Sequence, residues 1–164
     1  MPELKSAADN KGVLNLGVTL PILVFFVLDR ILKNIFLIKK IGYQIGLFKF
    51  SLIKNSQVIF GYFPPGFWFY LLVGLIFIFL IYKLINSYRQ GQTWLMAALI
   101  LVILGGFSNL LDRIKYDFVI DYIHFLNWSF FNLADLMIWA GIIIIVIKTF
   151  ASSHQLTKDK IEVE

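Results

Sequence analysis

The stretch Phe131-Asn132-Leu133-Ala134-Asp135-Leu136-Met137-Ile138-Trp139-Ala140 places two polar side chains at the start of a long apolar run. Residues 136–147 carry no charge, and a helix needs roughly 20 mostly apolar residues to cross ~30 Å of hydrocarbon. The run reaches that length only if the helix begins near Phe130. The sequence therefore predicts that Asp135 lies inside a membrane-spanning helix, where a carboxylate is costly and usually pairs with a base, faces a polar cavity or carries chemistry.

The composition of the whole chain is that of an integral membrane protein. Of its 164 residues, 59% are hydrophobic and 15% are charged, with a mean hydropathy of +0.80; soluble domains average ~45–50% apolar and ~25% charged residues. Further uncharged runs cover residues 13–28, 58–82 and 94–111. We expect one integral membrane domain over residues 1–164, an all-α four-transmembrane-helix bundle with helices over about 13–38, 67–86, 94–113 and 130–150.

The two longer connections, about 39–66 and 114–129, are predicted to lie at the same end of the bundle. The connection 86–93 is short and polar, so the second and third helices should form a tight antiparallel hairpin. Parts of both longer connections alternate between apolar and polar residues, which indicates short strands. We expect these two segments to form a small β-rich extracytoplasmic cradle. An even number of spans puts both termini on one side, but the basic residues are spread too evenly to set the orientation.

Polar residues collect at the end that holds these two connections. Asn109, Asp112 and Arg113 follow an i, i+3, i+4 spacing and are expected to share a helix face, as are Asn132 and Asp135. The connection between these two helices carries Asp121, and the fold is expected to bring it to the mouth where they meet.

Two neighbouring carboxylates in a site of low dielectric constant cannot both ionise, so they share a proton. One then acts as general base on a water, while the protonated partner polarises the scissile carbonyl. Arg113 or Asn132 could orient substrate carbonyls, because each offers donors in a fixed geometry. This chemistry requires no metal and no cofactor. The absence of cysteine excludes disulfides and thiolate metal sites.

Several motifs, taken together, resemble the lipoprotein signal peptidases (signal peptidase II). They are Gly105-Gly106 before Asn109-x-x-Asp112-Arg113, Val119-x-Asp121-Tyr122, Phe131-Asn132-x-Ala134-Asp135, Leu28-Asp29-x-x-x-Lys33, and Lys54-Asn55 with Phe60. The turn Gly91-Gln92-Thr93-Trp94-Leu95 is also similar to that family's. The motifs occur in the right order and cover nearly the whole chain.

The resemblance implies a multi-pass aspartyl endopeptidase of the bacterial inner (cytoplasmic) membrane, with both termini cytoplasmic. Its substrates would be diacylglyceryl-modified prolipoproteins, cut just before the lipidated cysteine, and a globomycin-like lipopeptide would inhibit it. Other expected partners are membrane lipids, with no nucleic acid, and the protein would be a monomer. The resemblance assigns three sets of residues: Asp121 and Asp135 as the catalytic dyad, Asn109, Arg113, Asn132 and Asn55 as positioning residues, and Asp29, Lys33 and Asp112 as supporting residues.

The chain departs from the family pattern at Gln57, Ile59, Ser108, Asp117 and Trp128-Ser129. The family usually has glycine and alanine where Gln57 and Ile59 stand. It usually has glycine at the positions of Ser108 and Asp117, and Phe-Pro at the position of Trp128-Ser129. These residues are outside the dyad, so the departures bear on substrate preference more than on reaction type.

Other interpretations attach to the same residues. Asp29 and Lys33 suit a structural ion pair better than a proton path, and Asp112 beside Arg113 suits a positioning pair, with substrate contact by Arg113 as the alternative. Asn109 either positions the dyad or only forms a hydrogen bond that holds two helices together.

Rival functions have weaker support. A metalloprotease is disfavoured because the chain has two histidines and no His-Glu-x-x-His. Ser108 lacks the context of an intramembrane serine protease. Two alternatives remain: a catalytically silent relative that binds lipopeptides, and a small proton-coupled membrane transporter or adaptor. The second is disfavoured because the four helices contain no inverted repeat.

Overall fold

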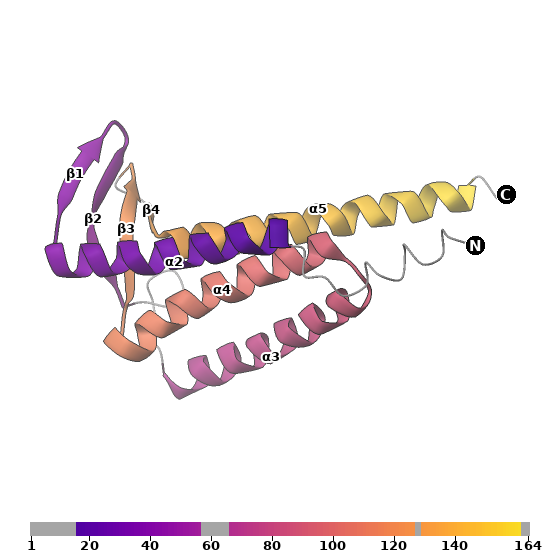
Figure 1. Ribbon diagram of the computed structural model, residues 1–164, viewed down its shortest axis with the longest axis horizontal. Helices are drawn as coiled ribbons and strands as arrows, with labels where there is room; N and C mark the ends of the chain where they lie inside the picture. Colours follow the sequence, from indigo (N-terminus) through magenta and orange to yellow (C-terminus); the bar gives the residue numbers. More distant parts are fainter. Residues whose placement is uncertain (1–15, 57–65, 127–128, 162–164) are drawn as a thin grey trace.

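The computed structural model describes residues 16–56, 66–126 and 129–161. The helices are α2 (Leu16–Lys39), α3 (Phe67–Arg89), α4 (Thr93–Tyr116) and α5 (Leu133–Ile161). The strands are β1 (Gly42–Ile45), β2 (Phe48–Asn55), β3 (Val119–Phe125) and β4 (Ser129–Phe131). Figure 1 shows the helices running side by side with the strands gathered at one end. Gln57, Ile59, Phe60 and Trp128 lie outside the described residues.

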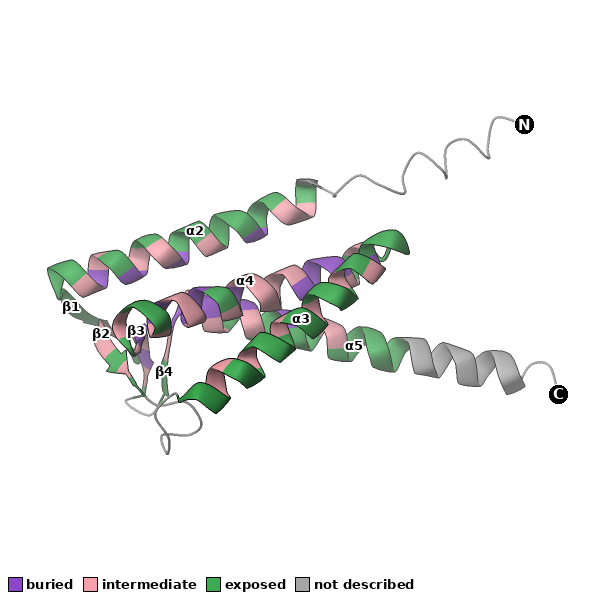
Figure 2. Cartoon of the chain, turned by 90° about the horizontal axis from the view of Figure 1, so that it is seen from below, coloured by how far each residue is buried: buried purple, intermediate pink, exposed green. Residues whose placement is uncertain are grey.

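Three of the described helices are long and apolar enough to cross a membrane: α3, α4 and the segment Leu133–Ala151 of α5. Most of α3 is exposed, as Figure 2 shows, because its apolar side chains point away from the protein. Such a surface is suited to contact with lipid tails. The fourth helix, α2, is as long as α4, but Asp29, Arg30 and Lys33 interrupt its apolar sequence. The prediction of four spans therefore depends on how these charges are accommodated.

Helix α4 packs against α2, α3 and α5. Two glycines allow α4 and α5 to approach closely. A Cβ atom at Gly105 would lie 2.5 Å from the backbone oxygen of Ala134, and one at Gly141 would lie 2.6 Å from that of Ala98. Small residues at such contacts let helix backbones come together. Gly105, the first of the paired glycines, lies at such a contact.

The strands form one antiparallel sheet in the order β1-β2-β3-β4. Because β1 and β2 come from the first long connection and β3 and β4 from the second, the sheet joins the two loops, as the alternating patterns predicted. The pairing of β2 with β3 is irregular between Phe50 and Ile53, and it places Ile53 opposite Asp121 and Asn55 opposite Val119. The turn between α3 and α4 lies at the opposite end of the bundle (Figure 1).

The chain leaves α4 through Asp117, which caps the helix in the left-handed conformation with φ 62°. This position commonly holds glycine, and asparagine and aspartate are the side chains that tolerate it best. Asp117 therefore replaces an expected glycine without preventing the turn from α4 into β3.

Candidate active site

Asp121 and Asp135 come from different elements and meet at Asn132. Asp121 lies in β3 and is 1% exposed, whereas Asp135 lies in the first turn of α5. The Nδ2 atom of Asn132 donates to Oδ1 of Asp121 at 2.7 Å, and its backbone nitrogen donates to Oδ2 of Asp135 at 3.0 Å. One residue thus binds both carboxylates.

The position of Asp135 follows from how α5 begins. Asn132 precedes the helix, and its Oδ1 atom accepts the backbone N–H of Asp135 at 3.0 Å. Together with the return bond from the backbone N–H of Asn132 to the Asp135 carboxylate, this is a reciprocal capping box. The pattern Asn-x-x-Asp at the start of an apolar run therefore fixes both residues through local backbone geometry. The charge of Asp135 also lies at the positive end of the helix dipole.

Two further amides bind the carboxylates from other elements. Asn55, the last residue of β2, donates to Oδ2 of Asp121 at 3.0 Å. Asn109 on α4 donates to Oδ1 of Asp135 at 2.7 Å. Each carboxylate thus accepts from two groups, and each of its oxygens has a donor.

A buried cluster of charges lies beside these amides. The Lys33 ammonium is 2.8 Å from Oδ2 of Asp112 and 3.2 Å from Oδ2 of Asp29, and all three side chains are fully buried. Lys33 also donates to Oδ1 of Asn109 at 2.7 Å. The arrangement of Asp29 and Lys33 is that of a structural ion pair.

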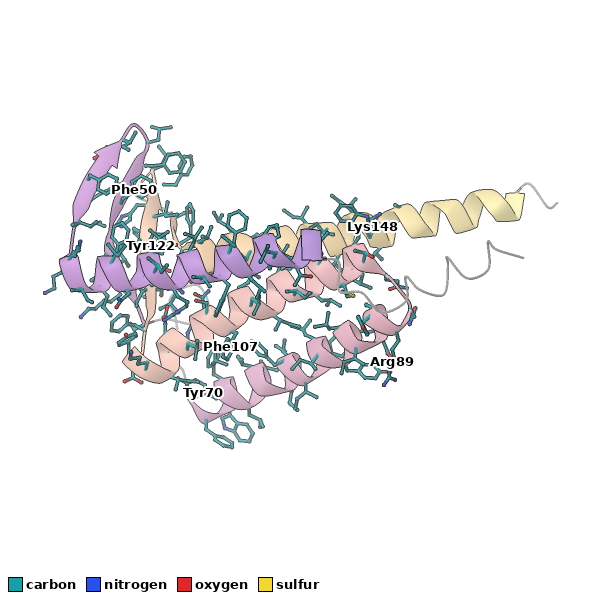
Figure 3. All side chains as sticks on the ribbon, viewed as in Figure 1. Phe50, Tyr70, Arg89, Phe107, Tyr122 and Lys148 are labelled. Carbon is teal, nitrogen blue, oxygen red and sulfur yellow. The ribbon has the colours of Figure 1, made fainter. Side chains whose placement is uncertain are left out.

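Asp29 links α2 to three other elements. It accepts hydrogen bonds from Ser108 Oγ at 2.5 Å, Tyr122 Oη at 3.1 Å and the backbone nitrogen of Ala134 at 3.1 Å. Figure 3 shows Tyr122 at the junction of β3 with α2. Its ring stacks on Phe36 with a centroid separation of 5.1 Å. Burial and the charge of Asp29 raise the pKa of Tyr122, so its hydroxyl stays protonated and donates.

The expected pairing of Asp112 with Arg113 is wrong. Asp112 instead binds Arg30 at 2.7 Å and Lys33 at 2.8 Å, both on α2. Consecutive helical residues point in different directions, so Arg113 cannot share the environment of Asp112. The Arg113 guanidinium lies 5.5 Å from the centroid of the Phe69 ring on α3, and its buried Nε atom has no hydrogen-bond partner within the described segments.

Burial raises the pKa of Asp121 to about 6, and the negative charge of Asp135 adds to this effect. Hydrogen bonds from Asn55 and Asn132 and the positive charge of Lys33 act in the opposite direction. The raised pKa allows Asp121 to hold a proton near neutral pH. A carboxyl with this property, beside a second carboxyl, can serve in acid–base chemistry.

Two apolar pockets adjoin the carboxylates. One, of about 230 Å³, lies between α3 and α4 and has Asn109 and Arg113 among its lining residues. The other, of about 500 Å³, is lined mainly by aromatic side chains, together with Asp135. Asn109, which lines the first pocket, donates a hydrogen bond to Asp135, which lines the second.

Within the described residues, no group of three or more His, Cys, Asp or Glu side chains could hold a metal ion. Ser108 donates to Asp29 and accepts from Lys33 and Arg30, so its hydroxyl links the buried charges of α2 to α4. His124 instead bonds to Ser51.

The structure brings together Asp29, Lys33, Asn55, Asn109, Asp112, Asp121, Asn132 and Asp135, and it places Arg113 in the neighbouring pocket. The sequence did not predict the bonding roles of Arg30, Tyr122 and Ser108 in this site. Arg30 lies one turn before Lys33, so their shared helix face was a usable signal. No local pattern identified Ser108.

The fold is that of known bacterial membrane enzymes. One solved structure of a bacterial membrane enzyme matches with a TM-score of 0.70 and 17% identity, covering 84% of this chain and 89% of the other. A second matches with a TM-score of 0.68 and 20% identity, covering 81% of this chain and 92% of the other. The chain thus shares the fold of these enzymes, and three of its described helices are long and apolar enough to make it a multi-pass membrane protein.

The chain belongs to the signal peptidase (SPase) II family, whose family model matches residues 21–151. A lipoprotein signal peptidase of Streptococcus pyogenes is 29% identical over 104 residues, covering 62% of this chain and 68% of the relative. The lipoprotein signal peptidase of Streptococcus agalactiae is 30% identical over 100 residues, covering 60% of this chain and 58% of the relative. The lipoprotein signal peptidase of Buchnera aphidicola is 37% identical over 90 residues, covering 52% of this chain and 58% of the relative.

Proposed function

We propose that the protein is a membrane-embedded aspartyl endopeptidase that removes signal peptides from diacylglyceryl-modified prolipoproteins, cutting before the lipidated cysteine. Membership of the signal peptidase II family supports the peptidase activity and the substrate class. The observation that supports the aspartyl mechanism is the pair of carboxylates, Asp121 and Asp135, joined through Asn132.

In this mechanism the two carboxyl groups share one proton, since both cannot ionise at close range in a buried site. Asp121, with its pKa of about 6, exchanges that proton near neutral pH. The ionised carboxylate removes a proton from the attacking water, and the protonated partner donates a hydrogen bond to the scissile carbonyl oxygen. Asn55, Asn109 and Asn132 hold both side chains in position.

The pockets support a substrate with two apolar parts. The signal peptide lies in the groove between α3 and α4, where the buried Nε–H of Arg113, which has no hydrogen-bond partner among the described residues, can donate to a peptide carbonyl. The aromatic pocket beside Asp135 takes the lipid of the modified cysteine. A cyclic lipopeptide such as globomycin would compete for the same space.

The proposed topology has four spans in the inner membrane, with both termini cytoplasmic and the sheet on the opposite face. The buried contacts of α2 support its role as the fourth span. Asp29 and Lys33 are fully buried and neutralise each other, and Arg30 pairs with Asp112 of α4. These charges are paired within the protein, so α2 can present an apolar face to lipid. In this proposal the whole chain acts as one membrane domain and works as a monomer.

Incubation of the purified protein with a diacylglyceryl-modified precursor tests this proposal. We expect a product shortened by the signal peptide on a gel and no product from the same precursor without lipid. Equal cleavage of both precursors would contradict lipid recognition. Binding of the modified precursor without cleavage would identify a catalytically silent relative.

A further inference from the structure

A third pocket, separate from the two beside the dyad, lies between α2, the end of α4 and β3. Its volume is about 370 Å³, and it shares no lining residue with the other two pockets. Its polar lining residues are Arg30, Asn34, Lys115 and Tyr116, and its apolar ones are Phe26, Val27, Ile31 and Ile120. The proposed peptidase mechanism uses none of them.

The polar end of this pocket is positively charged. The Arg30 guanidinium bonds to Ser108 and Asp112 through its Nη1 atom. Nη2 and Nε carry three further N–H donors, and these have no protein partner in the described part of the chain. Lys115 is exposed and makes no ion pair there; its ammonium lies 5.0 Å from the centroid of the Tyr116 ring.

The balance of charge favours an anion. Asp29 and Asp112 are matched by Arg30 and Lys33 in the buried cluster, which leaves the charge of Lys115 in excess. No carboxylate lines the pocket. A bound phosphate would therefore meet two cations, whereas the ammonium group of a zwitterionic headgroup would find no carboxylate partner.

The apolar end of the pocket points toward the middle of the bundle. Val27, Arg30, Ile31 and Asn34 follow a helical i, i+3, i+4, i+7 spacing on α2. Because α2 runs toward the sheet, Phe26 and Val27 lie farther from the sheet than Arg30 and Asn34. Val27 is 51% and Ile31 49% exposed, so the protein leaves this surface open. Lys115 and Tyr116 end the apolar span Thr93–Tyr116, which places the polar end at headgroup depth.

We propose that this pocket binds one anionic phospholipid, with its phosphate between Arg30 and Lys115 and an acyl chain along Val27 and Ile31. The charge of the polar end, the apolar surface beside it and its depth in the membrane all match a lipid of this kind. Because Arg30 also binds Asp112, an occupied site supports the cluster that contains Lys33. The bound lipid thereby stabilises the helix packing behind the dyad.

Lipid binding to the purified full-length protein tests this site independently of cleavage. Native mass spectrometry in detergent would compare phosphatidylglycerol with phosphatidylcholine and with inorganic phosphate, for wild type, Lys115→Gln and Lys49→Gln. Lys49 is an exposed lysine on β2 at the same end of the bundle and does not line the pocket. We expect one phosphatidylglycerol to bind preferentially and to raise the melting temperature. Lys115→Gln should weaken that binding about fivefold, and Lys49→Gln should not.

Three results would overturn the proposal. If Lys115→Gln and Lys49→Gln weakened phosphatidylglycerol binding equally, the lipid would be attracted to the basic surface in general and not to this pocket. Equal binding of phosphatidylcholine would mean that the charge of the headgroup is not recognised. Inorganic phosphate that binds and stabilises as well as phosphatidylglycerol would define a free-anion site in place of a lipid site. Both substitutions replace exposed side chains, so each variant is expected to fold.

Discussion

The Lys33 ammonium on α2 donates a 2.7 Å hydrogen bond to the Oδ1 atom of Asn109 on α4. That oxygen also accepts from Nδ2 of Asn132 at 3.1 Å. With two donors at its oxygen, the Asn109 amide can only direct its nitrogen toward Asp135, to which it donates at 2.7 Å. A buried charge on α2 thus sets the orientation of an amide that binds a candidate catalytic carboxylate on α5.

Replacing Lys33 with methionine should destabilise the protein strongly. Methionine fills similar space but leaves Asp29 and Asp112 without the ammonium that both contact. Loss of one partner of a buried ion pair costs about 3–5 kcal/mol, which would lower the melting temperature by several degrees or more. Lys39→Met, at an exposed position of the same helix, is the control. Similar melting temperatures for the two variants would contradict a supporting role for Lys33.

Asp121→Asn and Asp135→Asn should each abolish cleavage while leaving the protein folded. Asparagine keeps the size of the side chain but removes the shared proton and the base, and loss of acid–base catalysis lowers rates by ~10²–10⁴-fold. The double variant should be no slower, since the two groups act as a unit. Asp117→Asn is the control, because Asp117 is exposed and asparagine also tolerates its left-handed backbone. Full activity in Asp135→Asn would overturn the aspartyl mechanism.

Asn55→Ala should shift the pH dependence of cleavage. Asn55 donates to Oδ2 of Asp121, and this bond favours the ionised form and lowers the pKa. Without it, the pKa of Asp121 should rise above its value of about 6. A rate that depends on a protonated Asp121 falls as pH rises through that pKa, so the decline should move to higher pH. Initial rates across a pH series would measure the shift, with Ser56→Ala as control. A shift to lower pH would contradict this assignment.

Gly105→Ala should disturb the contact between α4 and α5. The added Cβ would lie 2.5 Å from the backbone oxygen of Ala134 and 2.9 Å from Cγ1 of Ile138. Overpacking of this kind costs about 1–3 kcal/mol, and here it would also displace the start of α5, where Asp135 lies. Both the melting temperature and the cleavage rate should fall. Gly74→Ala, where a Cβ meets no atom within 4 Å, should leave both near wild type.

Single cysteines at Gln90 and Ser56 should label from opposite sides of the membrane. Both positions are exposed; Gln90 lies in the turn between α3 and α4, and Ser56 follows β2 of the sheet. The chain has no cysteine of its own, so labelling by an impermeant maleimide reports only the introduced residue. The proposed topology places Gln90 in the cytoplasm. Labelling of both residues from the same side would exclude the four-span arrangement.

The sequence predicted well those features that depend on neighbours along the chain. Apolar runs predicted α3, α4 and the membrane segment of α5, because the length and polarity of a span are local properties. Alternation predicted the strands. The spacing from Asn132 to Asp135 predicted that these two residues lie close together, although Asn132 caps α5 and does not share a helix face with Asp135.

The sequence predicted poorly which charges pair across elements. Asp112 was expected to pair with Arg113, its neighbour in sequence, but it binds Arg30 and Lys33 of another helix. Helix packing decides such partners, since it determines which side chains are buried together. The same reason explains why Ser108 was not recognised: its hydroxyl links α2 to α4 only after the two helices have packed.

For this protein, then, the sequence by itself determined a membrane-embedded chain, the strands of its two loops and the acids that gather at one end. Its motifs also indicated the family. Only the tertiary structure decided that Asn132 and Asn109 orient the carboxylates, that Lys33 fixes Asn109, and that Arg30 joins the buried cluster. Hydropathy and periodicity are set by the order of residues. Hydrogen-bond partners and raised pKa values arise from burial beside residues that are distant in sequence.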